Sequence, residues 1–111
     1  LPFVSPKDTV TDGIWAMTKG RLGLCIVCDK DHKLVGLFTD GDLRRNLNKA
    51  LIGLKAEDIM TDNPSTIAPD ALASTAMAEL NARSITSLLV CEAGKPVGLI
   101  HLHDLLKIGV A

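Results

Sequence analysis

Aromatic side chains are scarce in this sequence: they make up 3% of its 111 residues, and tyrosine is absent. Because hydrophobic residues nevertheless reach 47%, the core must consist of leucine, isoleucine, valine, alanine and methionine. Surfaces on which a base or sugar could stack are therefore few. The chain also lacks excess positive charge, since its net charge is −1. We therefore expect no nucleic-acid partner.

No apolar run reaches 18 residues and no signal-peptide pattern is present, so we expect no membrane partner and a cytoplasmic location. The three cysteines are Cys25, Cys28 and Cys91. Cys25 and Cys28 have CxxC spacing but lie in an apolar run, where residues three apart on a strand face opposite sides. They cannot share a metal ion, so we expect buried apolar cysteines in a reducing compartment and no metal cofactor. The opening Leu1-Pro2-Phe3-Val4 has no start methionine, and we expect the chain to be a piece of a longer protein.

An internal repeat dominates the sequence. The run from Gly36 to Leu43 returns, with changes, as the run from Gly98 to Leu105, 62 residues later. Further back the shift becomes 63 residues and pairs Pro6 with Pro69. Two such units, each too short to bury its own faces, predict an α/β (α+β) fold of two βαββα repeats packed as a pseudo-twofold pair. We place the first repeat at residues 1–53 and the second, with its connector, at 54–111.

Apolar periodicity and turn residues predict the elements within each repeat. The first repeat is expected to contain strands at 3–5, 22–28 and 34–38, a helix ending near Gly20 and a helix at 43–50. The second is expected to contain strands at 65–68, 87–91 and 96–100, a helix at 72–82 and a closing helix from Leu105. Between them, residues 56–61 should form a short helix docked on the second repeat.

A signature of Gly, two apolar residues, Thr or Ser, two more residues and Asp occurs in the first repeat. Its sequence there is Gly36-Leu37-Phe38-Thr39-Asp40-Gly41-Asp42. Together with the duplication and the connector Asp58-Ile59-Met60-Thr61, it resembles a tandem pair of CBS domains over essentially all 111 residues. That resemblance implies a regulatory module that binds adenosyl and other nucleotide ligands in the clefts between its sheets. It also implies a homodimer through the helices that follow the signature runs, for which we expect Leu43, Leu47 and Leu51, with Leu105, Leu106 and Ile108, to provide the apolar surface.

A narrower resemblance lies in residues 38–45 and 101–106. These are similar to the C-terminal CBS pair of bacterial arabinose-5-phosphate isomerases, which carry their chemistry in an upstream SIS domain and feed the synthesis of Kdo for lipopolysaccharide and capsules. This implies a parent isomerase and no enzymatic activity in the present chain. It also implies no required cofactor and a nucleotide effector, with CMP-Kdo, AMP and ATP as candidates. The alternative is a structural dimerisation module without a ligand.

The residues at the signature run have two interpretations each. Asp42 could cap a helix as its N-cap, or its carboxylate could accept hydrogen bonds from ribose hydroxyls. Thr39 could stabilise a turn, or it could donate to a phosphate beside Arg44 and Arg45. The resemblance places Thr39 and Asp42 opposite Ser84, Thr86 and Ser87 of the other repeat. This cleft, with hydroxyls on both sides, is the predicted nucleotide site.

The second repeat has His101 where the first has Thr39. With His103 and Asp104 it could bind a metal, donate to a phosphate or sugar, or form a cap. The resemblance places His101 and Asp104 opposite Arg21, Gly23 and Leu24. No residue pattern predicts catalysis, because there is no nucleophile with an adjacent base, no carboxylate pair and no P-loop.

Overall fold

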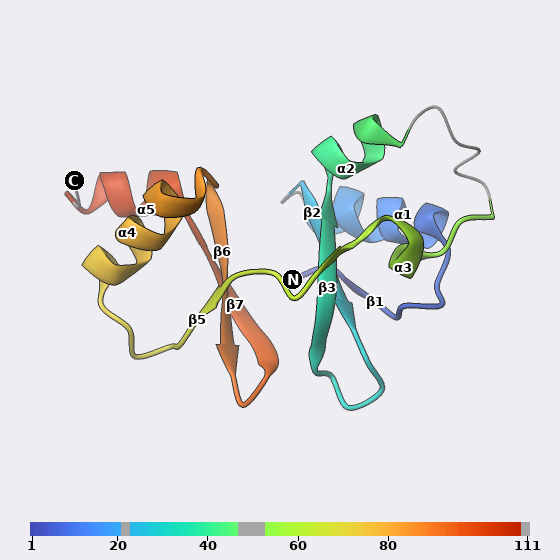
Figure 1. Ribbon diagram of the computed structural model, residues 1–111, viewed down its shortest axis with the longest axis horizontal. Helices are drawn as coiled ribbons and strands as arrows, with labels where there is room; N and C mark the ends of the chain where they lie inside the picture. The colour runs from blue at the N-terminus through green and yellow to red at the C-terminus, as the bar shows by residue number, and fades with distance from the viewer. Residues whose placement is uncertain (21–22, 47–52, 110–111) are drawn as a thin grey trace. The chain divides into compact units, whose positions relative to one another are not determined.

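The computed structural model describes residues 1–20, 23–46 and 53–109 (Figure 1). The chain divides into two compact units, Leu1–Pro64 and Ser65–Ala111. Each unit has its own sheet and its own apolar core, so the two are described separately. The division into repeats at 1–53 and 54–111 stays a prediction, but by packing the connector lies in the first unit.

The first unit contains a four-stranded sheet in the order β1-β2-β3-β4. Strand β2 runs parallel to β1 and antiparallel to β3, and β4 pairs antiparallel with the outer edge of β3. Its elements are β1 (Phe3–Val4), α1 (Val10–Gly20), β2 (Leu24–Cys28), β3 (Leu34–Thr39), α2 (Asp40–Arg45), α3 (Ala56–Ile59) and β4 (Thr61–Asp62).

The second unit contains a three-stranded sheet in the order β5-β6-β7, with helices on one side of the β6–β7 hairpin (Figure 1). Its elements are β5 (Thr66–Ile67), α4 (Ala73–Arg83), β6 (Ser87–Glu92), β7 (Lys95–His101) and α5 (Leu102–Lys107). The predicted order of strand, helix, strand, strand and helix is therefore confirmed in both units. Even the irregularities repeat, because each hairpin has a register shift at the same place, after Val27 and after Val90.

Both cores are mainly aliphatic, as the composition predicts, but the core of the first unit also contains Phe38, which is 0% exposed. In the first unit every residue of β2 is buried, because the strand lies between β1 and β3 and beneath α1. Its core cluster consists of Val4, Val10, Met17, Cys25, Val27, Phe38, Ala56 and Ile59. The cluster of the second unit consists of Ile67, Ala76, Met77, Leu80, Leu88 and Leu105.

The cysteines of β2 are buried in the apolar sheet, as predicted. Burial, with smaller contributions from the charge of Asp8 and from Cys28, raises the pKa of the Cys25 thiol to about 12. Burial also raises the pKa of Cys91. Thiolates are the reactive and metal-binding form of cysteine, so burial disfavours that form at Cys25 and at Cys91.

Two helix starts differ from the predictions. The helices expected from Leu43 and Leu105 begin three residues earlier, at Asp40 and Leu102. The turn-forming composition of Asp40-Gly41-Asp42 is overridden because the residue before each helix caps its first turn. The predicted end of the first of these helices, the start of the strand at 22, and Leu47 and Leu51 lie outside the described residues.

The connector, residues 54–62, packs on the first unit, so the predicted docking of its helix on the second repeat is wrong. Ala56 and Ile59 belong to the core cluster of the first unit, with exposed fractions of 0% and 7%. Backbone hydrogen bonds between the connector and the residues around the start of α1 fix its position on the first unit. Val10 N–H donates to Leu54 O at 2.9 Å, and Ala56 N–H donates to Asp8 O at 2.8 Å.

Gly36 shows how closely the connector approaches β3. A Cβ atom at Gly36 would lie 2.6 Å from the Thr61 carbonyl oxygen and 2.7 Å from the Met60 sulfur. At the equivalent Gly98 on β7, the nearest atom to such a Cβ is the Val90 Cβ at 3.7 Å. The same glycine is therefore crowded in one unit and has room in the other.

We expect Gly36→Ala to lower the free energy of unfolding by about 1–3 kcal/mol, the usual cost of overpacking. Gly98→Ala is the matched control and should change it by less than about 0.5 kcal/mol, since alanine fits there and glycine weakens a strand interior. Urea denaturation followed by circular dichroism measures both. Equal losses in the two variants would contradict the close approach of the connector.

Candidate functional site

The end of β3 is joined to the start of α2 by a reciprocal pair of hydrogen bonds. Thr39 N–H donates to Asp42 Oδ2 at 2.9 Å, and Asp42 N–H donates to Thr39 Oγ1 at 3.4 Å. The Thr39 hydroxyl also reaches Asp42 Oδ2, at 3.2 Å. This is a capping box in which Thr39 is the N-cap and Asp42 is the third helical residue. The prediction of Asp42 as the N-cap was wrong, because the helix begins at Asp40.

Asp42 is 8% exposed and is the one buried charged or polar residue in the described part of the chain. Such a carboxylate is stable only when its oxygens have partners. Oδ2 is held by Thr39, whereas Oδ1 accepts a hydrogen bond from the Arg45 guanidinium, one turn along α2. The Arg45 side chain is 70% exposed. One side of the carboxylate is thus part of the fold, and the other is covered by a side chain that water can solvate.

Gly23 lies beside this capping box within the same unit. It has a positive φ of 68°, a conformation that favours glycine, and its carbonyl oxygen accepts a hydrogen bond from Asp40 N–H at 3.3 Å. The next residue, Leu24, pairs with Thr39 across the hairpin. A pocket of about 230 Å³ adjoins Gly23 and Asp40, and its other lining residues are Ile14, Met17, Thr18 and Leu43. Arg21, which was predicted to face His101 and Asp104 together with Gly23 and Leu24, lies outside the described residues.

The second unit repeats the capping box with histidine in place of threonine. His101 N–H donates to Asp104 Oδ2 at 3.2 Å, and His103 N–H donates to His101 Nδ1 at 3.1 Å. The rings of His101 and His103 stack with centroids 4.9 Å apart. Of the three interpretations of His101, the structure shows the cap. No group of three histidine, cysteine or carboxylate side chains suited to a metal occurs within the described ranges.

Asp104 is exposed, unlike Asp42, and its side chain accepts the hydrogen bond from His101 N–H. Nearby, Ser87 pairs with His101 between β6 and β7, and Leu102 N–H donates to Thr86 O at 2.7 Å. Ser84 ends α4 in the left-handed conformation.

Within the first unit Gly23 and Leu24 lie beside Thr39 and Asp42, and within the second Thr86 and Ser87 lie beside His101 and Asp104. The prediction had placed the two members of each set in different clefts. The predicted facing of the two groups across the repeats stays a prediction. Sequence reasoning missed the contact of Arg45 with Asp42, although their spacing of three residues places the two side chains on one helix face.

The chain belongs to the CBS domain family, whose model matches residues 1–49 and 56–111. Among solved structures it is similar to the CBS domain NE2398, with a TM-score of 0.85 and 27% identity over 100% of this chain and 89% of that one. It is also similar to CBSX2, which was solved in complex with AMP, with a TM-score of 0.81 and 26% identity over 97% of this chain and 86% of that one.

Within this family the chain is homologous to a region of the arabinose 5-phosphate isomerase KdsD. It is 38% identical to KdsD of Yersinia pestis over 99% of this chain and 34% of that protein. The chain thus spans about a third of the length of the curated relatives it matches. None of the helices in the described part of the chain is long and apolar enough to cross a membrane.

The two capping boxes should differ in their contribution to stability. We expect Asp42→Ala to lower the free energy of unfolding by about 1–3 kcal/mol, because it removes the acceptor of a half-buried backbone N–H and of the Thr39 hydroxyl. Asp104→Ala removes an exposed acceptor and should cost about 0.5 kcal/mol. Urea denaturation of the two variants measures the difference. A larger loss in Asp104→Ala would contradict the assignment of Asp42 as the better anchored carboxylate.

Proposed function

We propose that this chain is the regulatory nucleotide-binding module of an arabinose 5-phosphate isomerase, and that the nucleotide binds at the Thr39–Asp42 end of the first unit. Membership of the CBS family and the AMP bound by the similar CBSX2 support a nucleotide ligand. Similarity to KdsD supports the isomerase context. The observation that carries the choice of site is the buried Asp42 carboxylate, which has one oxygen held by Thr39 and one that accepts a hydrogen bond from the exposed Arg45 side chain.

The proposed ribose contact uses Asp42 Oδ1. A carboxylate can accept about four hydrogen bonds, and in this site Thr39 occupies Oδ2. Vicinal ribose hydroxyls would take over Oδ1 when the Arg45 side chain moves into solvent. The loss of an ion pair with so exposed a partner costs little. The buried charge stays satisfied throughout, because the ribose hydroxyls replace the guanidinium hydrogen bond.

The proposed phosphate contact uses Arg45, whose side chain the ribose displaces from Asp42 Oδ1. Arg45 lies on the same short helix as Asp42, so a phosphate attached to the bound ribose would meet its guanidinium nearby. The same arginine thus neutralises Asp42 without a ligand and binds the phosphate with one.

In the parent protein, effector binding would bias an isomerase domain in the rest of the chain, which we propose to be an upstream SIS domain. We assign the isomerase reaction to that domain and none to this module. CMP-Kdo is the candidate effector by feedback logic in a pathway to Kdo, and AMP and ATP are the candidates by family. The predicted cytoplasmic location fits each of these ligands.

Titration calorimetry with AMP, ATP and CMP-Kdo tests the proposal. We expect at least one to bind, and Asp42→Asn to weaken it by about ten- to a hundredfold, the range for a hydrogen bond to a charged group. Asp104→Asn is the matched control in the second unit and should matter less. If no nucleotide binds at millimolar concentration, the module is a scaffold. If Asp104→Asn abolishes binding and Asp42→Asn does not, the ligand binds in the second unit.

A second pair of variants separates the phosphate contact from the ribose contact. Arg45→Gln should weaken AMP and leave adenosine unchanged, because only AMP offers a phosphate. Arg44→Gln changes the adjacent, equally exposed arginine and serves as the control. Equal effects of the two variants would show that positive charge acts on the ligand from a distance and not through a contact of Arg45.

The alternative function is a dimerisation module, and the exposed end of α5 favours it. Leu106 is 52% exposed. Among the other predicted interface leucines that the structure describes, Leu105 is buried in the core of its unit and Leu43 packs against the core of the first unit, so these two contribute less.

Light scattering at 100 μM should show a dimer of the 11.8 kDa chain if this surface pairs. Leu106→Glu should then shift it to the monomer, because the charge would have to be desolvated at the interface. Lys107→Glu at the neighbouring exposed position is the control. A monomeric wild-type chain would contradict the homodimer.

A further inference from the structure

The second unit has an uncovered face where the first unit is covered by its connector. In the first unit, residues 54–62 close the side of the sheet next to β3 in two ways. Ala56 and Ile59 fill the core, with Leu54 and Met60 packed beside them. Strand β4 then pairs with the outer edge of β3, where Thr61 lies opposite Leu37 and Asp62 opposite Gly36.

Hydrogen bonds hold the connector in place. Its backbone meets Pro6, Asp8 and Val10, which lie around the start of α1: Glu57 N–H donates to Pro6 O at 3.1 Å, beside the two bonds of Asp8 and Val10 described above. The Lys7 ammonium forms an ion pair with Glu57 at 2.7 Å. At the sheet edge, Asn63 N–H donates to Val35 O at 3.4 Å.

The repeat identifies the equivalent positions in the second unit. Pro69, Ala71 and Ala73 correspond to Pro6, Asp8 and Val10, and Val97, Gly98 and Leu99 correspond to Val35, Gly36 and Leu37. The matching register shifts of the two hairpins confirm this alignment, since Val27 pairs with Gly36 and Val90 pairs with Gly98. We call the surface formed by these positions of the second unit the open face.

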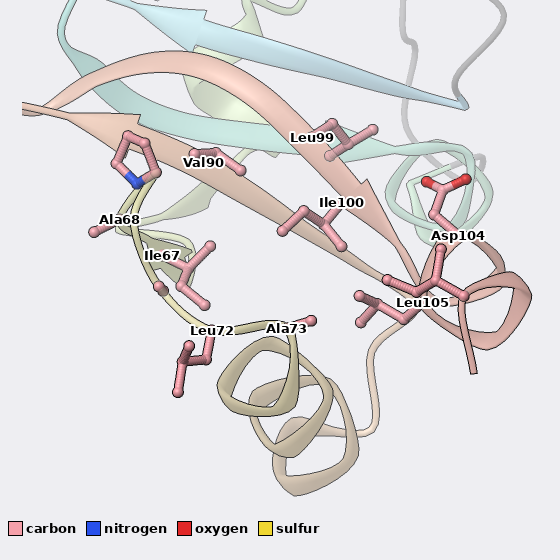
Figure 2. A pocket seen from close by; sticks show the side chains of 12 residues that line it. Ile67, Ala68, Leu72, Ala73, Val90, Leu99, Ile100, Asp104 and Leu105 are labelled. Atoms are coloured by element: carbon pink, nitrogen blue, oxygen red, sulfur yellow. The ribbon is translucent and has the colours of Figure 1, made fainter. Parts of the chain in front are cut away.

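A pocket of about 340 Å³ occupies the open face (Figure 2). Its lining includes Pro69, Ala71 and Ala73 together with Leu99, Ile100 and Ile108. Two apolar side chains of its lining are largely exposed to solvent, Leu72 by 71% and Ile108 by 70%. Val97, on the same strand as Leu99, is 54% exposed. In the first unit, Val35 at the position of Val97 is partly buried against the core cluster that holds Ala56 and Ile59.

The outer strand of the second sheet carries a further sign of a missing neighbour. Strand β7 is the edge of the sheet in the described part of the second unit, and an exposed apolar edge strand is a site for strand addition. Gly98 lies in its interior, although no atom is nearer than 3.7 Å to a Cβ built there. A glycine inside a strand typically marks the close approach of another backbone, and Gly36 serves that purpose in the first unit.

We propose that the open face binds a peptide segment of the connector type, a helical turn with two apolar residues three apart followed by an extended strand that pairs with β7. The occupant is the segment that precedes this stretch in a longer chain. The connector stands directly before β5 of the second unit, yet it covers the first unit. By the same exchange, the residues directly before β1 cover the second. A longer chain has enough residues for such a segment, because the matched region is about a third of the length of the relatives.

The test joins a copy of residues Leu54–Asn63 to the N-terminus of Leu1. This places the copy at the same distance before β1 as the connector has before β5. We expect the melting temperature to rise by several degrees and the β7 amides to exchange at least about tenfold more slowly in hydrogen exchange. The matched control carries the same copy with serine at the two positions that correspond to Ala56 and Ile59, and it should behave like the unextended chain.

A variant of the open face completes the test. Val97→Asp, introduced with and without the extension, should remove most of the gain in melting temperature that the extension provides, because the charge would be buried under the copy. Three outcomes would overturn the proposal: β7 exchange unchanged by the extension, equal protection with the serine control, or protection of β7 in the unextended chain that rises with protein concentration. The last would assign the open face to a second copy of the chain. Nucleotide binding is not measured, so failure here is independent of the proposed function.

Discussion

The structure depends on the closure of a small sheet along the outer edge of its last strand. A hairpin with one short parallel strand leaves apolar surface beside its outer strand uncovered, and the outer strand leaves backbone groups unpaired. The first unit meets both needs with one segment, since Ala56 and Ile59 fill the core while Thr61 and Asp62 extend the sheet. This contact requires the connector to lie close to β3, and the absence of a side chain at Gly36 allows that approach.

The same closure positions the end of the first unit at which we propose that a ligand binds. Strand β3 is held between β2 and β4, and at its end the capping box joins Thr39 to Asp42. A rigid strand end fixes the start of α2, and with it the direction of the carboxylate. The charge on Asp42 can stay buried because Thr39 and Arg45 satisfy both oxygens. One carboxylate oxygen of Asp42 is thus held by the end of β3, and the other by an exposed side chain of α2.

The two units contain the same local motif, the capping box, in two different environments. His101 replaces Thr39 as the cap, and the backbone hydrogen bonds of the capping box survive because an imidazole nitrogen accepts as a hydroxyl oxygen does. The burial of the acidic residue differs between the units, since Asp104 is exposed and Asp42 is buried. Sequence similarity between the repeats therefore establishes the cap, but it does not establish the binding properties of the carboxylate.

The order of the elements, the repeat and the aliphatic core were determined by the sequence alone. Apolar periodicity and the run from Gly36 to Asp42 are local signals, and local hydrogen bonding makes them reliable. The helix starts at Asp40 and Leu102 were missed because a capping side chain overrides turn-forming composition. Only the tertiary structure decided which unit the connector covers. Ala56 and Ile59 fit the core of either repeat by composition, and the choice rests on backbone hydrogen bonds to Asp8 and Val10, distant in sequence, which no local pattern encodes.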